Sequence, residues 1–261
     1  MIIDSHLHLG YLSGFYNYDA TYTALINMME SLDIGYAISS SLYSLDYGDM
    51  EKGYLMDIEA YEASKGRILS YYVYNPHEAE KSLSLMEKYA NRDIFRGIKI
   101  HPSWHGHFAD DEKYRPVYEY ARAKKLVILS HTWTESLTNP VQKFSVPSHF
   151  EKYVSEFPDV TLILGHSGGR FEGINEAIKL GRKYPNVCFD VAGDIYIDGF
   201  VETLILNAGA EKVLFGSDYP MMDPRIMLGV VMGSGISEED KEKILCGNAS
   251  RLFGIGVGRE A

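Results

Sequence analysis

The sequence predicts a single (β/α)8 TIM barrel of the α/β class, and three observations support this prediction. First, the chain has 261 residues, which is close to the usual length of one such barrel. Second, eight short runs rich in β-branched and apolar residues alternate with amphipathic stretches of helical length, a pattern typical of βαβ units around a parallel sheet. Third, polar residues recur at the carboxyl ends of these runs.

Each of these elements can be placed along the chain. Asn75 before Pro76 is a typical helix start, and Ser237 with Asp240 resembles a capping box. There is no repeat, low-complexity tract or linker, so we expect residues 1–261 to form one catalytic domain. The predicted strands are residues 2–8, 34–40, 68–74, 97–101, 126–131, 160–166, 187–191 and 213–218, with helices near 19–32, 50–65, 76–91, 111–124, 148–157, 171–184 and 199–208.

Composition excludes several classes of partner. The formal net charge of −11 argues against nucleic acid, because phosphate binding needs a basic surface. No apolar run approaches the ~20 residues of a membrane span, and the N-terminus has no signal-peptide pattern. Cys188 and Cys246 are far apart and form no CxxC motif, which favours a reducing, cytoplasmic compartment. We expect a small-molecule substrate, with a homodimer as the default assembly.

Polar residues at the strand ends carry the chemistry. The period-two alternation of a strand places His6 and His8 on one face and Leu7 on the other. In a parallel barrel all strand ends point to one mouth, where active sites of this fold lie. Buried charged groups are costly unless they are paired or bound to a metal, so the set indicates a catalytic metal site. Its members are His6, His8, Lys99, His101, His131, His166, Asp190 and Asp218.

Each residue also has an ordinary structural interpretation. A lone histidine at a strand end is more often hydrogen-bonded than metal-bound, Asp218 alone could cap a helix, and Lys99 could be a core lysine. His105 and His107 form a second HxH motif, but in a loop, where surface or substrate contact is the favoured interpretation. The long irregular stretch 132–147 is expected to lie over the mouth.

The ordered motifs resemble the amidohydrolase superfamily, specifically the amidohydrolase-2 branch of metal-dependent hydrolases and decarboxylases. The resemblance extends from residue 2 to about residue 254. It rests on Ile3-Asp4-Ser5-His6-Leu7-His8, Gly97-Ile98-Lys99-Ile100-His101-Pro102, Leu129-Ser130-His131, Leu164-Gly165-His166-Ser167-Gly168-Gly169, Phe215-Gly216-Ser217-Asp218-Tyr219-Pro220 and the closing Gly247-Asn248-Ala249-Ser250-Arg251-Leu252-Phe253.

The resemblance implies a role for each matching position. His6, His8, His131 and Asp218 would hold one divalent metal, and His166 would be the catalytic histidine or bind a second metal. Zinc is the first choice for this set, with Mn, Fe, Co or Ni also compatible. A second metal would require carboxylated Lys99, as in binuclear relatives. Because the branch is usually mononuclear, an unmodified lysine is expected, contacting substrate or Asp218.

The resulting functional prediction is hydrolysis of a small, acidic lactone, amide or ester-like substrate by a metal-activated water. Asp218 would move the proton and His166 would polarise the substrate oxygen. His101 is expected as a further contact to metal or substrate. Two alternatives stay open: nonoxidative decarboxylation of an aromatic or enol acid, and a metal-binding module without catalysis. Substrate contacts are expected from Arg170, which would meet a carboxylate, and from Trp104, Trp133 and Tyr219 as walls of the pocket.

Overall fold

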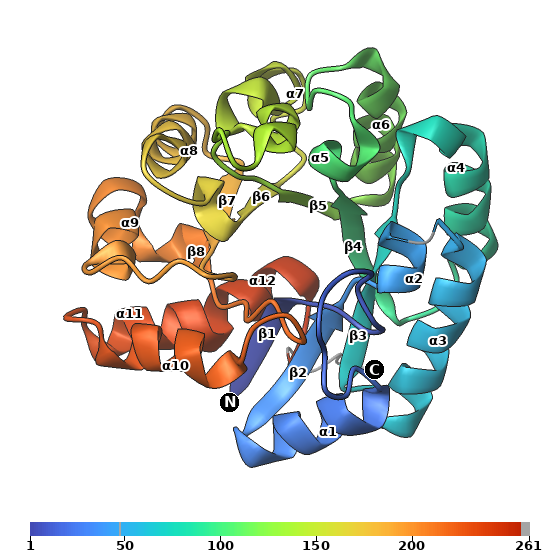
Figure 1. The fold of residues 1–261 in the computed structure, drawn as a ribbon, viewed down its shortest axis with the longest axis horizontal. Helices are drawn as coiled ribbons and strands as arrows, with labels where there is room; N and C mark the ends of the chain where they lie inside the picture. Colours follow the sequence, from blue (N-terminus) through green and yellow to red (C-terminus); the bar gives the residue numbers. More distant parts are fainter. Residues whose placement is uncertain (47, 257–261) are drawn as a thin grey trace.

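The computed structural model describes residues 1–46 and 48–256 and confirms the barrel. Eight parallel strands follow one another in the order β1 to β8, and helices surround them (Figure 1). Every predicted strand is present, with ends that differ by a few residues. The strands are β1 Ile2–Leu7, β2 Ile34–Ser39, β3 Ile68–Val73, β4 Phe95–Ile100, β5 Val127–His131, β6 Leu162–Gly165, β7 Val187–Asp190 and β8 Val213–Leu214.

Helices connect the strands as expected, with additional short ones at the mouth. Asn75 and Ser237 cap helices as predicted, since their side chains accept the N–H of His77 and Asp240. The predicted helix at 76–91 is split into a 3-10 turn, Pro76–Glu78, and α4. The α-helices are α1 Tyr22–Ser31, α2 Leu42–Leu45, α3 Met50–Ala63, α4 Ala79–Lys88, α5 Pro102–His105, α6 Arg115–Lys124, α7 Glu151–Glu156, α8 Glu172–Lys183, α9 Phe200–Ala208, α10 Pro224–Gly233, α11 Glu238–Glu242 and α12 Asn248–Phe253.

The last strand is much shorter than the predicted 213–218, and the barrel closes by other means. Beyond Leu214 the chain pairs with the first strand through single hydrogen bonds: Ser5 N donates to Phe215 O at 3.0 Å and Asp218 N to His6 O at 2.8 Å. Buried Asp4 adds a side-chain link, because its Oδ1 accepts the N–H groups of both His6 and Ser217. Strand one is therefore held against the segment that carries Asp218.

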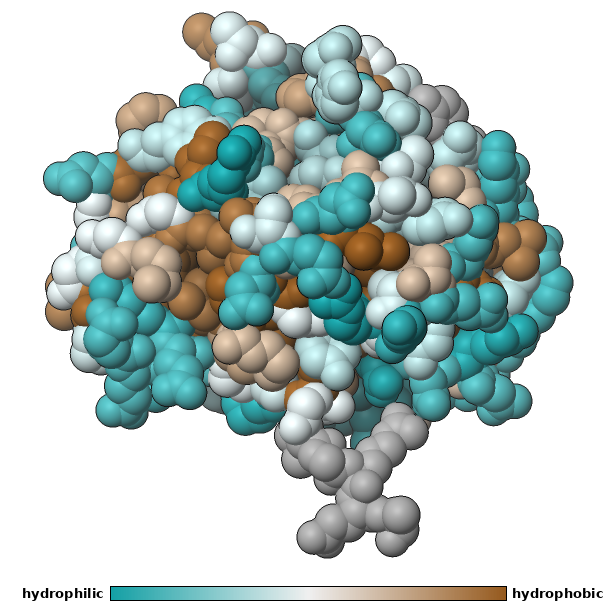
Figure 2. All heavy atoms as spheres, turned by 90° about the horizontal axis from the view of Figure 1, so that it is seen from below, coloured by the Kyte–Doolittle hydropathy of each residue, from teal (hydrophilic) through white to brown (hydrophobic). Residues whose placement is uncertain are grey.

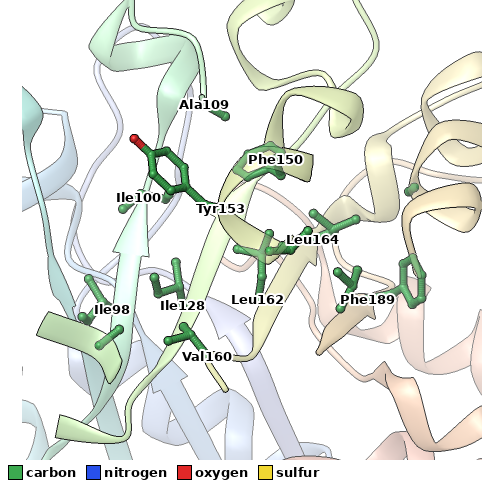
Figure 3. Close-up of a cluster of buried hydrophobic side chains, with 14 of the residues drawn as sticks. Ile98, Ile100, Ala109, Ile128, Phe150, Tyr153, Val160, Leu162, Leu164 and Phe189 are labelled. Carbon is green, nitrogen blue, oxygen red and sulfur yellow. The ribbon is translucent and has the colours of Figure 1, made fainter. Parts of the chain in front are cut away.

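Two apolar layers position the strands. One lies between strands and helices, and Figure 3 shows it around Ile98, Ile128 and Leu162, which pack against Phe150 and Tyr153. The other fills the barrel interior and its amino-terminal end, where Phe253 of α12 contacts Tyr71 at a ring separation of 5.9 Å. Its buried members are Ile3, Ile38, Leu69, Tyr71, Val127, Leu129, Ile163, Cys188, Leu214, Ala249, Phe253 and Ile255.

This packing decides which side chains face the mouth. Ile98 and Ile100 of β4 belong to the outer layer, so the intervening Lys99 points into the barrel.

On the outside, Figure 2 shows a face on which hydrophilic residues predominate and hydrophobic ones gather near the centre. No helix within the described ranges is long and apolar enough to cross a bilayer.

Candidate active site

The two histidines of β1 are held in defined tautomers by oxygen acceptors. His6 Nδ1 lies 2.8 Å from Asp190 Oδ2 at the end of β7. His8 Nδ1 lies 2.9 Å from the carbonyl oxygen of Ser40, which can only accept. The proton of each ring therefore sits on Nδ1, and each Nε2 carries a lone pair. This is the arrangement in which metal-ligating histidines are usually held.

These lone pairs converge with a carboxylate. His8 Nε2 lies 3.3 Å and His6 Nε2 3.9 Å from Asp218 Oδ1. His6, His8 and Asp218 offer ligand atoms that all lie within 4.8 Å of one another. Electron-rich atoms facing one another in a buried place repel unless a cation lies between them. The donor set therefore fits a divalent metal, and two nitrogens with one carboxylate oxygen suit several first-row ions.

Lys99 occupies the floor of this site. Its Nζ lies 2.8 Å from His6 Nε2, and the side chain is 1% exposed. Burial lowers its pKa to about 8, although the carboxylates of Asp190 and Asp218 act in the opposite direction. The expected position near the site is thus observed, but the hydrogen-bonding partner is His6 and not Asp218.

Asp218 remains a carboxylate in spite of its burial. Burial alone would raise its pKa, but the close approach of His8 and the proximity of His166 and His6 outweigh this effect and hold the pKa well below its ordinary value. For His6 and His8, burial is the dominant influence and lowers the pKa, which keeps both rings neutral. Asp218 also has a backbone φ of +64°, an uncommon conformation for a residue other than glycine.

His131 lies beside this group but outside it. Its Nε2 is 2.9 Å from Gln142 Oε1, and burial lowers its pKa well below the ordinary range. Within the described chain, it belongs to neither of the two clusters whose ligand atoms lie within 4.8 Å. Its predicted role as a ligand therefore stays a prediction.

His166 faces the same centre from the end of β6. Its ring centroid lies 4.8 Å from that of His6 and 4.9 Å from that of His131. Nδ1 is 3.1 Å from the carbonyl oxygen of Ala192, so the proton of the neutral ring sits there and Nε2 can accept. A side chain at Gly193 would place its Cβ 2.7 Å from this Nδ1, so the close approach requires glycine. His6, His166 and Asp190 form the second cluster of potential ligands.

A column of flat rings lines one wall. His101 lies between Trp104 and His131, with ring centroids 4.1 Å away on both sides and interplanar angles of 8° and 7°. Trp133 continues the column, 6.2 Å from His131 at 9°. His101 Nδ1 accepts the N–H of Trp104 at 3.2 Å, so it caps the short helix α5. His101 thus supports His131 by stacking.

A cavity of about 680 Å³ opens above these residues. Arg170 lies at its rim, exposed, paired with Asp194 and 5.7 Å from the ring of Trp133. Tyr219 was expected in this wall, but it lines a neighbouring cavity, and its hydroxyl donates to Asp19 O. Other lining residues include His8, Lys99, His101, Trp104, His131, Thr134, Gln142, His166 and Asp218.

The second HxH motif does not contribute to this site. His105 Nδ1 is 2.9 Å from the hydroxyl of Tyr114, and His107 Nδ1 is 3.0 Å from Asp111 Oδ2. His105 ends the short helix α5 and is buried, contrary to the expectation of a surface loop, whereas His107 follows the helix in a bend and is partly buried. Neither residue is among those that line the cavity.

Three supporting residues were not assigned from the sequence. Asp190 was noted only as a polar strand end, whereas it anchors His6 and accepts the N–H of His166 through Oδ1 at 2.8 Å. Ser40 acts through its backbone carbonyl, for which a sequence carries no signal. Gln142 lies within the long stretch 132–147, where only the expectation of a mouth loop pointed to it.

Comparison with known proteins decides the family. The family model Amidohydro_2, described as Amidohydrolase, matches residues 51–255, most of the chain. The chain belongs to the amidohydrolase family. This confirms the resemblance drawn from the motifs, although the model match leaves out the segment that holds His6 and His8.

This amidohydrolase is similar to two decarboxylases and to a further TIM-barrel protein. A gamma-resorcylate decarboxylase of Polaromonas sp. (strain JS666 / ATCC BAA-500) is 30% identical over 122 residues, which are 40% of this chain and only 36% of that protein. A dihydroxybenzoic acid decarboxylase from Polaromonas sp. JS666, solved with manganese and the inhibitor 2-nitroresorcinol, has a TM-score of 0.75 at 15% identity and covers 98% of both chains. A TIM-barrel protein of Bordetella bronchiseptica has a TM-score of 0.75 at 18% identity, covering 97% of this chain and 98% of the other.

Proposed function

We propose that this amidohydrolase is a metal-dependent nonoxidative decarboxylase of a hydroxylated aromatic carboxylic acid. The observation that carries the proposal is the 30% identity with gamma-resorcylate decarboxylase over 122 residues. Decarboxylation was the alternative in the sequence prediction, and this relative favours it over hydrolysis. The proposal treats residues 1–261 as one catalytic domain.

The cavity suits a flat, acidic molecule. Its volume of about 680 Å³ lies in the range of small-molecule sites and exceeds the needs of a single aromatic ring. Trp104 and Trp133 provide flat surfaces at the wall, and Arg170 at the rim can meet a carboxylate. Lys99 in the floor of the site adds a further group that attracts an anion.

The metal would be held by His6, His8 and Asp218, with His131 as the fourth ligand. When bound, a divalent ion would orient the oxygen anions of the substrate and stabilise negative charge that develops on them. Zinc suits the histidine-rich set, and manganese is present in the Polaromonas structure, so both are candidates. We propose one metal per chain and an unmodified Lys99, as the resemblance to a branch that is usually mononuclear implies.

The reaction itself is a replacement of CO2 by a proton. The bond between the ring carbon and the carboxyl carbon breaks, its electron pair stays on the ring carbon, and a proton must then be added there. Asp218 is an anion before substrate binds, so it must first accept a proton, for which the phenolic hydroxyl of the substrate is a source. It can then deliver that proton to the ring carbon.

His166 has a different task. Its Nδ1–H is committed to Ala192 O, so a neutral ring offers only an acceptor at Nε2. It can donate to a substrate oxygen only when both ring nitrogens carry protons. A doubly protonated His166 would pair with an acidic substrate, which is consistent with a carboxylate ligand in this cavity.

The test compares the two reactions on the same protein. Chains loaded with manganese or zinc are supplied with dihydroxybenzoates, and CO2 release is measured; a panel of lactones is followed for ring opening. We expect CO2 release that is lost with His8→Ala, and no lactone opening. Lactone opening without CO2 release would reverse the assignment in favour of hydrolysis. Metal analysis that finds two ions per chain would contradict the mononuclear part of the proposal.

A further inference from the structure

Gln142 of the long loop lies within hydrogen-bonding distance of a histidine of the site. Its Oε1 lies 2.9 Å from His131 Nε2, and its side chain is 9% exposed. It belongs to a 3-10 segment, Pro140–Ser145, which reaches back from the loop toward the short helix α5. The question is whether the amide presents its oxygen or its nitrogen to the imidazole, because the two choices place the ring proton on opposite nitrogens.

A buried pair of serines decides the orientation of the amide. Ser145 Oγ accepts the N–H of Ser103 at 3.0 Å, and Ser103 Oγ, 2.6 Å away, is an acceptor for the proton of Ser145. The proton of Ser103 is then left for Gln142 Oε1, at 2.9 Å. In this series of hydrogen bonds, the hydroxyl protons of Ser103 and Ser145 both have an acceptor only if Gln142 presents its oxygen. That oxygen can accept a second hydrogen bond, from His131.

We infer that Gln142 is a positioning residue that keeps the proton of His131 on Nε2 and so leaves Nδ1 with a lone pair for the metal. This inference rests on the proposed metal site, and it assigns to His131 the opposite nitrogen from those of His6 and His8. The reversed amide would donate to Nε2, move the ring proton to Nδ1 and block ligation there.

Stacking reinforces the arrangement. His101 lies against the ring of His131 at 4.1 Å and 7°, which restricts rotation of the imidazole about its own axis. The orientation of the ring is therefore set by stacking, and its proton by Gln142. Partners of this kind typically change metal affinity by about 10- to 100-fold when they are removed.

A direct test measures the tautomer in metal-free protein by long-range ¹H–¹⁵N correlation NMR. We expect protonated Nε2 and unprotonated Nδ1 at His131. Protonated Nδ1 in the metal-free protein would overturn the inference. This readout needs neither substrate nor activity, so it is independent of the decarboxylase proposal.

Metal binding supplies the second test, with Mn²⁺ as the titrant. Gln142→Leu should weaken binding by about 10- to 100-fold, while Gln142→Glu, which retains an acceptor, should bind at least as tightly as the natural protein. Ser103→Ala should cause a smaller loss in the same direction. Thr138→Val is the matched control, because Thr138 lines the same cavity and its hydroxyl bonds Ser136 instead of an imidazole.

The outcomes separate the two proposals. If Gln142→Leu weakens Mn²⁺ binding and Gln142→Glu restores it, while no dihydroxybenzoate loses CO2, the inference stands and the proposed reaction fails. If Gln142→Leu and Gln142→Glu weaken binding equally, Gln142 only supports the loop and the inference is overturned. Unchanged Mn²⁺ affinity in Gln142→Leu also overturns it.

Discussion

His6 Nδ1 and Asp190 Oδ2 lie 2.8 Å apart at the mouth of the barrel, and both side chains are fully buried. The pair joins the first strand to the seventh across the barrel. Asp190 Oδ1 meanwhile accepts the backbone N–H groups of His166 and Ala192, at 2.8 and 3.1 Å. One carboxylate thus orients a predicted ligand and the predicted catalytic histidine together.

Replacing Asp190 by asparagine should therefore weaken metal binding. The amide can keep its oxygen toward the two backbone N–H groups, but its nitrogen then faces His6 and would donate to Nδ1, which moves the ring proton to Nε2. We expect a 10- to 100-fold loss of Mn²⁺ or Zn²⁺ affinity, of order a typical supporting-residue effect, measured by competition with a chelator. Asp194→Asn, at the cavity rim, is the control; equal affinities of natural protein and Asp190→Asn would contradict the assigned role.

His6 and His8 should be required for metal and activity together. Each contributes an Nε2 lone pair to the same centre, so His6→Ala or His8→Ala removes a ligand. We expect loss of bound metal in parallel with loss of activity, followed by elemental analysis after dialysis. A His6→Ala/His8→Ala protein that keeps its full metal complement would refute the assignment.

The titration of Asp57 should make the folding stability of the protein depend on pH, independently of the metal site. This buried carboxyl of α3 accepts a hydrogen bond from Ser70 Oγ at 2.7 Å, and burial raises its pKa from 3.8 to about 8. Between these values the folded protein holds a proton that the unfolded chain releases. The stability associated with the neutral form is therefore complete below pH 3.8 and is lost as the pH rises toward 8.

The variant Asp57→Asn cannot ionise at this position, so it avoids the loss of folding stability at higher pH. The unfolding free energy of Asp57→Asn, relative to the natural protein, should increase between pH 5 and pH 8 by at least about 1.4 kcal/mol, the value of one pKa unit. Chemical denaturation at several pH values measures it. Exposed Asp198→Asn should show a constant difference over the same range. A constant difference for Asp57→Asn as well would show that Asp57 is ionised in the folded protein.

Much of the fold could be read from the sequence because its signals are local. Strand runs and helix caps depend on residues a few positions apart, and the alternation of Ile98, Lys99 and Ile100 already predicts which side chain points inward. The end of β8 could not be predicted in this way. Asp218 lies beyond β8 because the chain after Leu214 is joined to β1 through single hydrogen bonds between distant segments, such as that from Ser5 N to Phe215 O.

In the site, too, some residues could be predicted from local sequence signals and others could not. His6, His8 and Asp218 were predicted to meet, and they do, since strand ends of a barrel share one mouth. The supports of these residues were not predictable: Ser40 acts through a carbonyl group, and Gln142 depends on how a long loop folds back. Tyr219 lines the neighbouring cavity, and its predicted contact with substrate stays a prediction.

His166 provides the last prediction, which separates catalysis from metal binding. His166 lies near His6 and Asp190 in a second group of potential ligands. Two features favour a role in the reaction. His6 Nδ1 and Asp190 Oδ2 already bind one another, so a metal in the second group would have to break that hydrogen bond. His6, His8, His131 and Asp218 would also already supply four ligands, which is the number zinc prefers.

We therefore expect His166→Ala to retain about one metal per chain while kcat falls roughly 100- to 1000-fold, the usual effect of removing one donor to a developing charge. KM should change less, since an interaction made mainly in the transition state leaves ground-state binding intact. Elemental analysis after dialysis and steady-state CO2 release measure the two quantities. His166→Asn, which can still donate through its amide, should recover part of kcat. If His166→Ala loses its metal in step with its activity, His166 is a ligand and the second group of residues is the true metal centre.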